Sequence, residues 1–169
     1  MRSIGKSIVA VFAVIGVIAS VQQLRGQSTS PFEGSAVGHV GIIVNDMDKT
    51  LKVFEQVFGV APGAAREVGP IPVIGYGDNT NTRVKFIQVT FGGTVFEFIQ
   101  PVSGPGPHKE HLDKFGQGLQ HIAFNVKDPK AATVFLQGMG VRQTMGNYFD
   151  MKEQLGFTFE LAGFPKPKQ

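Results

Sequence analysis

Hydrophobic and polar residues follow a clear order in the first half of the chain. The apolar, largely β-branched stretch GHVGIIV (38–44) predicts a strand. The segment from Asp46 to Gly59 has apolar side chains at helical spacing, an aspartate at its start and a glycine at its end, which predicts an amphipathic helix. Three more apolar segments predict strands, the last two joined by a Gly-Gly turn: 70–77, 82–91 and 94–101. The predicted order is therefore β-α-β-β-β.

The second half of the chain repeats this order. HVGIIVND, from His39, and HIAFNVKD, from His121, match without a gap 82 residues apart. The last strands also match, because TVFEFIQP resembles FTFELAGF and places Glu97 opposite Glu160. The second set of predicted elements is a strand, a helix and three strands: 119–126, 128–140, 141–145, 147–152 and 157–161. Two copies are too few for a solenoid, so the repeat favours a duplicated module that closes on itself.

The two ends of the chain differ from the repeat. Basic residues followed by an unbroken apolar run to Ala19 are typical of a secretory signal peptide, and the run is short for a membrane span. We therefore expect an exported, periplasmic or extracellular protein with no stable membrane association after cleavage. An anchor formed by the uncleaved segment is the alternative. We expect a signal peptide at 1–19, a linker at 20–36, a folded domain at 37–163 and a solvated tail at 164–169. Within the domain, module one covers 37–102, a linking helix lies within 103–118, and module two covers 119–163.

Composition removes several classes of function. The 169 residues are 42% hydrophobic, which suits one globular unit with a core. The absence of cysteine excludes disulfides, thiol catalysis, cysteine-based zinc sites and a lipid anchor on cysteine. The formal net charge of +3 comes from Arg2, Lys6 and Arg25, all ahead of the first acidic residue, Glu33. The remainder is neutral, so no nucleic-acid partner is expected.

Four residues of the repeat can carry chemistry. His39 and His121 begin the first strand of each copy, and Glu97 and Glu160 lie in the last strand between apolar neighbours. A histidine at a strand start is often only structural, and a strand glutamate often faces solvent. A carboxylate between aromatic residues is costly unless something pairs with it, however, and the His/Glu pair recurs in both copies. Two imidazoles and two carboxylates suit Zn²⁺, Ni²⁺, Co²⁺, Fe²⁺ or Mn²⁺, so we predict one divalent metal site.

The repeated segments resemble a known superfamily. The resemblance covers nearly all of the predicted domain and rests on four stretches: HVGIIVNDMDKTLKVFEQVFGV, FEFIQP, GQGLQHIAFNVKD and LGFTFELAG. These are similar to the vicinal oxygen chelate superfamily, and GQGLQHIAF is most similar to its glyoxalase I and methylmalonyl-CoA epimerase branches. The resemblance implies an α+β fold in which two paired βαβββ modules form a curved mixed sheet around a metal-binding cleft. It also implies a set of four metal ligands: His39, Glu97, His121 and Glu160.

The same resemblance implies an activity. A full His/Glu/His/Glu set resembles glyoxalase I, and the implied chemistry is proton abstraction next to a carbonyl with a metal-stabilised enediolate. A ligand carboxylate that can leave the metal can serve as the catalytic base, and we expect Glu160 first and Glu97 second. The implied function is an exported lyase or isomerase for a small molecule. Non-catalytic small-molecule binding and an extradiol-type dioxygenase are the alternatives.

The sequence restricts the substrate only weakly. No clear set of basic residues for a CoA or glutathione carboxylate is present, and the candidates are Arg66, Arg83, Lys85 and Arg142. CoA esters and glutathione are mainly cytosolic, so for an exported protein we expect a small oxygenated metabolite. The paired modules can close within one chain or across a homodimer.

Three other features have two interpretations each. His108 and His111 have a spacing that can bind metal on a helix, but their charged neighbours favour a solvated helix face. The Gly-, Pro- and Asn-rich segment 67–83 is either a loop that covers the cleft or a hairpin connection, and we favour substrate contact. Tyr148 and Phe149 either line the pocket or pack in the core.

Overall fold

The computed structural model describes residues 30–77 and 81–163. The predicted signal peptide 1–19, most of the linker and the tail 164–169 lie outside the described residues. The strands are β1 Ala36–Ile43, β2 Arg66–Val68, β3 Arg83–Phe91, β4 Thr94–Ser103, β5 Gly118–Val126, β6 Arg142–Met145, β7 Tyr148–Met151 and β8 Phe157–Gly163. The helices are α2 Met47–Phe58, α3 Pro107–Phe115, α4 Pro129–Gly138 and the short α5 Lys152–Leu155. Within the described ranges, no helix is long and apolar enough to cross a membrane.

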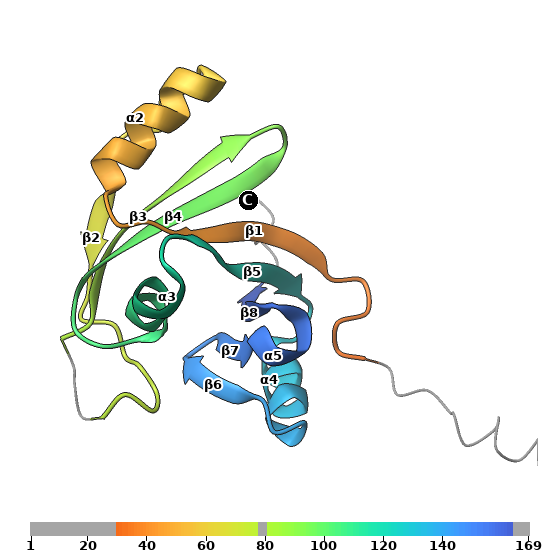
Figure 1. Cartoon of the computed structure of the whole chain (residues 1–169). Coiled ribbons are helices and arrows are strands. Elements are labelled where there is room, and N and C mark those ends of the chain that lie inside the picture. The colour runs from red at the N-terminus through yellow and green to blue at the C-terminus, as the bar shows by residue number, and fades with distance from the viewer. Residues whose placement is uncertain (1–29, 78–80, 164–169) are drawn as a thin grey trace, which may run out of the picture.

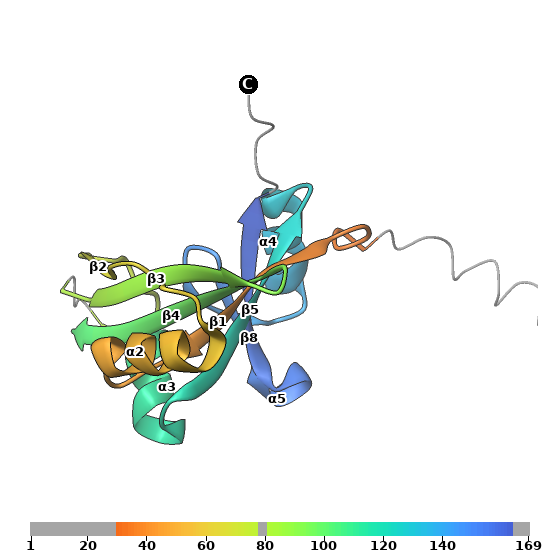
Figure 2. The ribbon, with the colours of Figure 1, turned by 90° about the horizontal axis from the view of Figure 1, so that it is seen from above.

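The strands of the two modules form one mixed sheet in the order β2-β3-β4-β1-β5-β8-β7-β6. The antiparallel β1–β5 pair joins the modules at the centre. Within each module the first strand runs parallel to the last, β1 beside β4 and β5 beside β8. The sheet curls into an open half-barrel (Figure 1), and the view from above shows the two halves meeting at β1 and β5 (Figure 2). The predicted α+β fold of two paired βαβββ modules is confirmed.

Helices cover both faces of the sheet. α2 packs on the outer face of module one, where Leu51 shares a buried cluster with Phe98 of β4. α4 packs in the same way on the outer face of module two. α3 lies on the inner face, where Leu112 packs against Ile43 of β1 and Ile99 of β4, and Figure 1 shows it between the two halves of the sheet. The inner face is therefore partly filled by the helix that connects the modules.

An aspartate starts the outer helix of each module. Asp46 Oδ1 accepts a hydrogen bond from Lys49 N at 3.0 Å. Asp128 Oδ1 accepts hydrogen bonds from the backbone N–H groups of Lys130 and Ala131, both at 3.0 Å. These caps satisfy amides that have no partner inside the helix. Because each aspartate follows the first strand of its module, the chain leaves the sheet at equivalent points.

The predicted strand 70–77 is wrong. The strand beside β3 is the short β2, and the segment after it is a loop whose prolines lack the N–H donors that a strand needs. Ile74 N donates to Thr144 O at 2.9 Å, and Val73 forms an isolated bridge with Met145. The loop therefore runs from the β2 edge of the sheet to the β6 edge and crosses the open side of the half-barrel.

Candidate metal centre

Four side chains from the central strands meet on the inner face of the sheet. His39 lies on β1, Glu97 on β4, His121 on β5 and Glu160 on β8. Their side chains are at most 12% exposed, and their ligand atoms all lie within 4.8 Å of one another. The structure therefore brings together all four residues that the sequence singled out.

The distances within this cluster suit a divalent cation. His39 Nε2 is 2.8 Å from Glu160 Oε2 and 3.5 Å from Glu97 Oε2. His121 Nε2 is 3.3 Å from Glu160 Oε2, 3.4 Å from Glu97 Oε2 and 3.3 Å from His39 Nε2. Metal–ligand bonds of about 2.0–2.2 Å separate neighbouring ligand atoms by about 2.8–3.6 Å. In the described residues, Glu160 Oε2 is also buried without a well-aligned hydrogen bond, so the donor set fits a metal ion.

The strand register explains why the carboxylates reach the histidines. Glu97 is the β4 partner of Gly41, and Glu160 is the β8 partner of Ala123. Gly41 and Ala123 each lie two residues after the histidine of their own module, on the same face of the strand. Each module therefore presents its histidine and glutamate side by side on the inner face.

The central β1–β5 pair then brings the two modules' histidines together. His39 is the cross-strand partner of Ala123, and His121 is the partner of Gly41. Each imidazole therefore faces a residue with little or no side chain. This arrangement leaves room for both rings, whose centroids are 5.4 Å apart.

Two amide side chains that the sequence interpretation missed hold the carboxylates. Gln88 Nε2 donates to Glu97 Oε1 and Asn147 Nδ2 donates to Glu160 Oε1, each at 2.9 Å. In both glutamates the second oxygen, Oε2, then faces the histidines. Gln88 was predictable, because the two-residue Gly-Gly turn sets the register that pairs it with Glu97. Asn147 lies in the turn between β6 and β7, and the sequence does not pair this position with Glu160 in the same way.

The electrostatics of the cluster favour positive charge at its centre. Burial lowers the pKa of His39, but the contacts with Glu160 and Glu97 outweigh it and raise this pKa to about 9. The pKa of His121 is raised through the same balance. Burial favours neutral carboxyl groups, yet the two imidazoles lower the pKa of Glu160 to about 2 and also lower that of Glu97. The carboxylates are therefore ionised at neutral pH and attract protons on the imidazoles or a metal ion.

The prediction that His108 and His111 lie on a solvated helix face is wrong. They are only 3% and 7% exposed, because residues three apart share one face of a helix and this face of α3 turns towards the sheet. His108 packs edge-on against Tyr148, and its Nδ1 lies 3.3 Å from Gln120 Oε1. The linking helix therefore contributes to the surroundings of the cluster.

Tyr148 and Phe149, which could each line the pocket or pack in the core, have different positions in the structure. Tyr148 lies at the cluster, with its hydroxyl oxygen 3.4 Å from His121 Nε2. Burial and the nearby carboxylates raise its pKa well above the ordinary value, so the hydroxyl stays protonated at neutral pH. Phe149 instead belongs to the buried outer-face core of module two.

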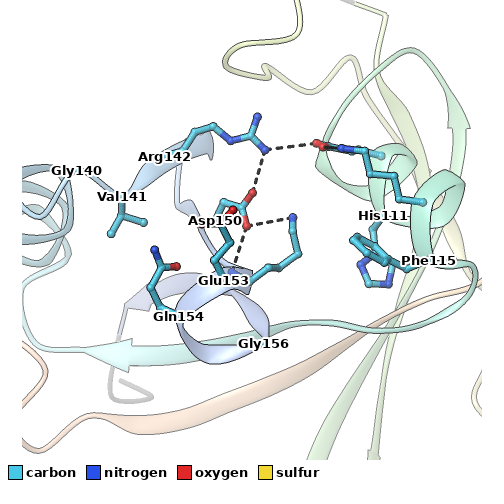
Figure 3. A pocket seen from close by; sticks show the side chains of 12 residues that line it. His111, Phe115, Gly140, Val141, Arg142, Asp150, Glu153, Gln154 and Gly156 are labelled. Atoms are coloured by element: carbon cyan, nitrogen blue, oxygen red, sulfur yellow. Dashed lines mark hydrogen bonds and ion pairs between the residues drawn. The ribbon is translucent and has the colours of Figure 1, made fainter.

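The structure also contains a pocket of about 790 Å³, and Figure 3 shows the side chains that line it. Its lining comes from α3, β6, β7, α5 and the turns next to β6 and α5, and the residues that line it include none of the four cluster residues. Arg142, a candidate for binding a substrate carboxylate, already contacts Asp150 at 2.9 Å and Glu110 at 3.5 Å. The other candidates lie on the β2 and β3 side of the sheet: Arg66, Arg83 and Lys85. The basic candidates therefore come from two separate parts of the sheet.

Comparisons with known proteins agree with this architecture. A sequence profile of the Glyoxalase/Bleomycin resistance protein/Dioxygenase superfamily matches residues 38–159. No match was found among curated proteins.

Several solved structures have the same fold. Methylmalonyl-CoA epimerase from Mycobacterium tuberculosis is 23% identical, with a TM-score of 0.57 over 85% of this chain and 95% of that chain. A Streptomyces coelicolor methylmalonyl-CoA epimerase variant in complex with 2-nitronate-propionyl-CoA is 21% identical, with a TM-score of 0.53 over 74% and 94%. A hypothetical protein from Bacillus halodurans is 18% identical, with a TM-score of 0.53 over 80% and 99%. At these identities the likeness concerns the fold.

Proposed function

The chain belongs to the Glyoxalase/Bleomycin resistance protein/Dioxygenase superfamily, and on this premise we propose that it is an exported, metal-dependent lyase or isomerase that removes a proton next to a carbonyl group. The observation that carries the proposal is the cluster of two imidazoles and two carboxylates, one of each from either module. This ligand set suits Zn²⁺, Ni²⁺, Co²⁺, Fe²⁺ or Mn²⁺. The amides of Gln88 and Asn147 support it, because they leave one oxygen of each carboxylate for the cation.

The cluster residues divide the work of such a reaction. A divalent cation supplies Lewis acidity to a substrate carbonyl and stabilises the negative charge that develops when the neighbouring proton leaves. His39 and His121 hold the cation through Nε2. Glu160, as a ligand carboxylate that can leave the metal, accepts the proton at Oε2, the carboxylate oxygen without a well-aligned hydrogen bond. Glu97, which holds the equivalent place in module one, is the second choice of base.

The proposed substrate is a small oxygenated metabolite. The two epimerase structures suggest a CoA thioester as the other class, because one of them contains 2-nitronate-propionyl-CoA. The predicted signal peptide favours the smaller compound, since CoA esters are mainly cytosolic. The pairing of Arg142 with Asp150 supports the same choice, because this guanidinium is already engaged.

Metal analysis of the purified full-length chain is the first test. We expect one Zn, Ni or Co ion per chain in the wild type and its loss in His121→Ala, with both proteins folded by circular dichroism. A wild-type chain that stays metal-free in the presence of all five candidate ions overturns the metal-dependent proposal. Bound iron with oxygen uptake on catechols replaces it with a dioxygenase.

Proton exchange tests the chemistry itself. In D₂O, the loaded protein should exchange the proton next to the carbonyl of a small hydroxycarbonyl compound, followed by NMR, and Glu160→Gln should abolish this exchange. A panel of acyl-CoA thioesters tests the second substrate class. Tight binding of a compound without exchange in either panel replaces the enzyme with a small-molecule-binding protein.

Export is tested by fractionating cells that express the full chain. A product cleaved after Ala19 in the periplasm or medium supports the predicted signal peptide, and a full-length product in the membrane fraction supports the anchor.

A further inference from the structure

A chain of buried hydrogen-bonding side chains connects the cluster of two histidines and two glutamates with α3. Gln120 Oε1 lies 2.7 Å from Nδ1 of His121 and 3.3 Å from Nδ1 of His108. His121, Gln120 and His108 are 0%, 1% and 3% exposed. Water therefore does not compete for these contacts, and each buried polar atom depends on the partner that the protein provides.

A bulge in β5 makes the contact between Gln120 and His121 possible. Neighbouring residues of a regular strand point to opposite faces of the sheet, so their side chains would not meet. In the β1–β5 ladder, however, Gly41 pairs with His121 and Ile42 pairs with Leu119. Gln120 is the extra residue at this irregularity, and bulges re-aim side chains in this way. The β1–β5 ladder is therefore irregular at Gln120, the residue next to the candidate ligand His121.

The chemistry of the contact determines which nitrogen of His121 is free. A carbonyl oxygen only accepts hydrogen bonds, so His121 must present Nδ1–H to Gln120 Oε1. Its Nε2, which faces His39, Glu97 and Glu160, then carries the lone pair that a metal ion needs. The opposite orientation of the amide would direct an N–H group at Nδ1 and require the proton on Nε2.

We propose that Gln120 and His108 are positioning residues that hold His121 in the Nδ1–H tautomer with its Nε2 directed at the metal ion. The inference rests on the metal site of the proposed function. Gln120 accepts the proton of His121 directly. His108 acts through Gln120, because its own Nδ1–H occupies the second lone pair of the same oxygen.

His108 matters because the other end of the amide is not held. In the described residues, Gln120 Nε2 is buried without a hydrogen-bond partner. The two imidazoles at Oε1 are therefore the polar contacts that fix which end of the amide faces His121. Removal of His108 leaves one of these contacts and allows the amide to turn over.

Metal affinity of the full-length chain tests the role of Gln120. Groups that orient a ligating histidine typically change metal affinity by about 10- to 100-fold when they are lost. We expect Gln120→Leu to weaken Zn²⁺ binding by this factor and Gln120→Glu, which keeps an acceptor oxygen, to bind at least as tightly as wild type. Equal weakening in both variants indicates packing alone and overturns the inference.

A matched pair of variants on α3 tests the role of His108. His108→Phe removes the Nδ1–H group and keeps a ring of similar shape. His111→Phe is the control, because His111 lies one turn away on the same buried face, and its Nδ1 has no hydrogen-bond partner among the described residues. We expect weaker Zn²⁺ binding in His108→Phe than in His111→Phe. Equal affinities overturn the role of His108.

The tautomer itself can be observed by ¹⁵N NMR, and the spectrum is simple because the chain has four histidines. In the zinc-bound wild type, His121 should show a protonated Nδ1 and a metal-bound Nε2, and in Gln120→Leu this preference should be lost. A zinc-bound His121 coordinated through Nδ1 overturns the inference while the proposed metal site stands. Failure of the wild type to bind any divalent metal overturns both.

Discussion

The imidazole of His121 lies directly against the backbone of Gly41. A Cβ atom added to Gly41 would lie 1.8 Å from Cε1 and 2.1 Å from Nε2 of His121. The ring is completely buried, so an added Cβ atom fits only if the ring or the strand shifts. The glycine in HVGIIV therefore makes room for a candidate ligand from the other module.

Gly41→Ala should consequently weaken metal binding by displacing His121. The backbone of Gly41 does not require a positive φ, so alanine is conformationally acceptable. The methyl group must displace the imidazole, and we expect Zn²⁺ affinity to fall by at least about 10-fold, as for other changes that misplace a ligating histidine. Calorimetric titration of the full-length variant measures this.

Gly138→Ala serves as the control for this substitution. A Cβ atom there has no atom of the described residues within 4 Å, and Gly138 ends α4 on the outer face. It should bind Zn²⁺ like the wild type. Wild-type affinity in Gly41→Ala would show that His121 is not a ligand.

Metal affinity should increase with pH. Contacts with the carboxylates outweigh burial and raise the pKa of His39 to about 9, and they also raise the pKa of His121. A metal ion must displace these protons, so each displaced proton contributes about a tenfold gain in affinity per pH unit below the pKa. Titrations between about pH 6 and about pH 8, in buffers with different ionisation enthalpies, measure both the gain and the protons released. An affinity that is constant over this range contradicts the proposed ligand set.

Without bound metal, the cluster should make stability depend on pH in two windows. The raised pKa of His39 stabilises the folded state below the ordinary value of 6.5, and this contribution is lost as pH rises towards about 9. The lowered pKa of Glu160 stabilises the folded state above 4.5, and this contribution is lost as pH falls towards about 2. Denaturant unfolding of the chelator-treated chain should therefore show that the cluster contributes most to the free energy of unfolding between these two pH windows. His39→Gln should remove most of the decline in the free energy of unfolding on the alkaline side. An unchanged decline contradicts the assignment of this pH dependence to His39.

The repeat made much of the site predictable from sequence. Gly41 and Ala123 occupy equivalent places after their histidines, so alignment of the two copies also aligned the ligand positions. Local periodicity, by contrast, placed the second strand of module one at 70–77, whereas the strand is Arg66–Val68. The apolar residues after it meet the far edge of the sheet through Val73. That long-range contact has no local signature.

α3 shows why a charged helix was misread. Its charges form pairs four residues apart, such as Lys114 with Glu110 at 2.6 Å, and these suggested a solvated helix. The opposite face carries His108, His111 and Leu112, and only the position of α3 on the inner face explains their burial. Likewise, the bulge that turns Gln120 towards His121 depends on how β5 pairs with β1. The alternation of side chains along a single strand does not predict this pairing.

Glu160→Gln should separate metal binding from turnover. The amide oxygen of glutamine can still ligate a metal ion, but it cannot accept a proton as a base. We expect turnover to fall by about 10²- to 10⁴-fold, the usual contribution of a general base, while metal content measured on the same sample at saturating metal concentration is retained. Glu97→Gln, examined in parallel, should lose less. A Glu160→Gln enzyme with intact turnover excludes Glu160 as the base, and the larger loss in Glu97→Gln would move the role to that residue.

The amides that hold the two carboxylates should matter equally in both modules. Gln88 and Asn147 each donate one hydrogen bond of 2.9 Å to Oε1 of their glutamate. Gln88→Leu and Asn147→Leu should therefore each lower Zn²⁺ affinity by about 10- to 100-fold, because a freed carboxylate no longer directs Oε2 at the cation.

Gln137→Leu is a suitable control for these variants, since Gln137 donates to Gln143 on the exposed surface. The double variant also distinguishes how the modules act. Independent anchors predict that the two losses in binding free energy add, within the limits for separate sites. If only Asn147→Leu weakens binding, module one does not supply a ligand through Glu97, and the site reduces to three protein ligands with an open position.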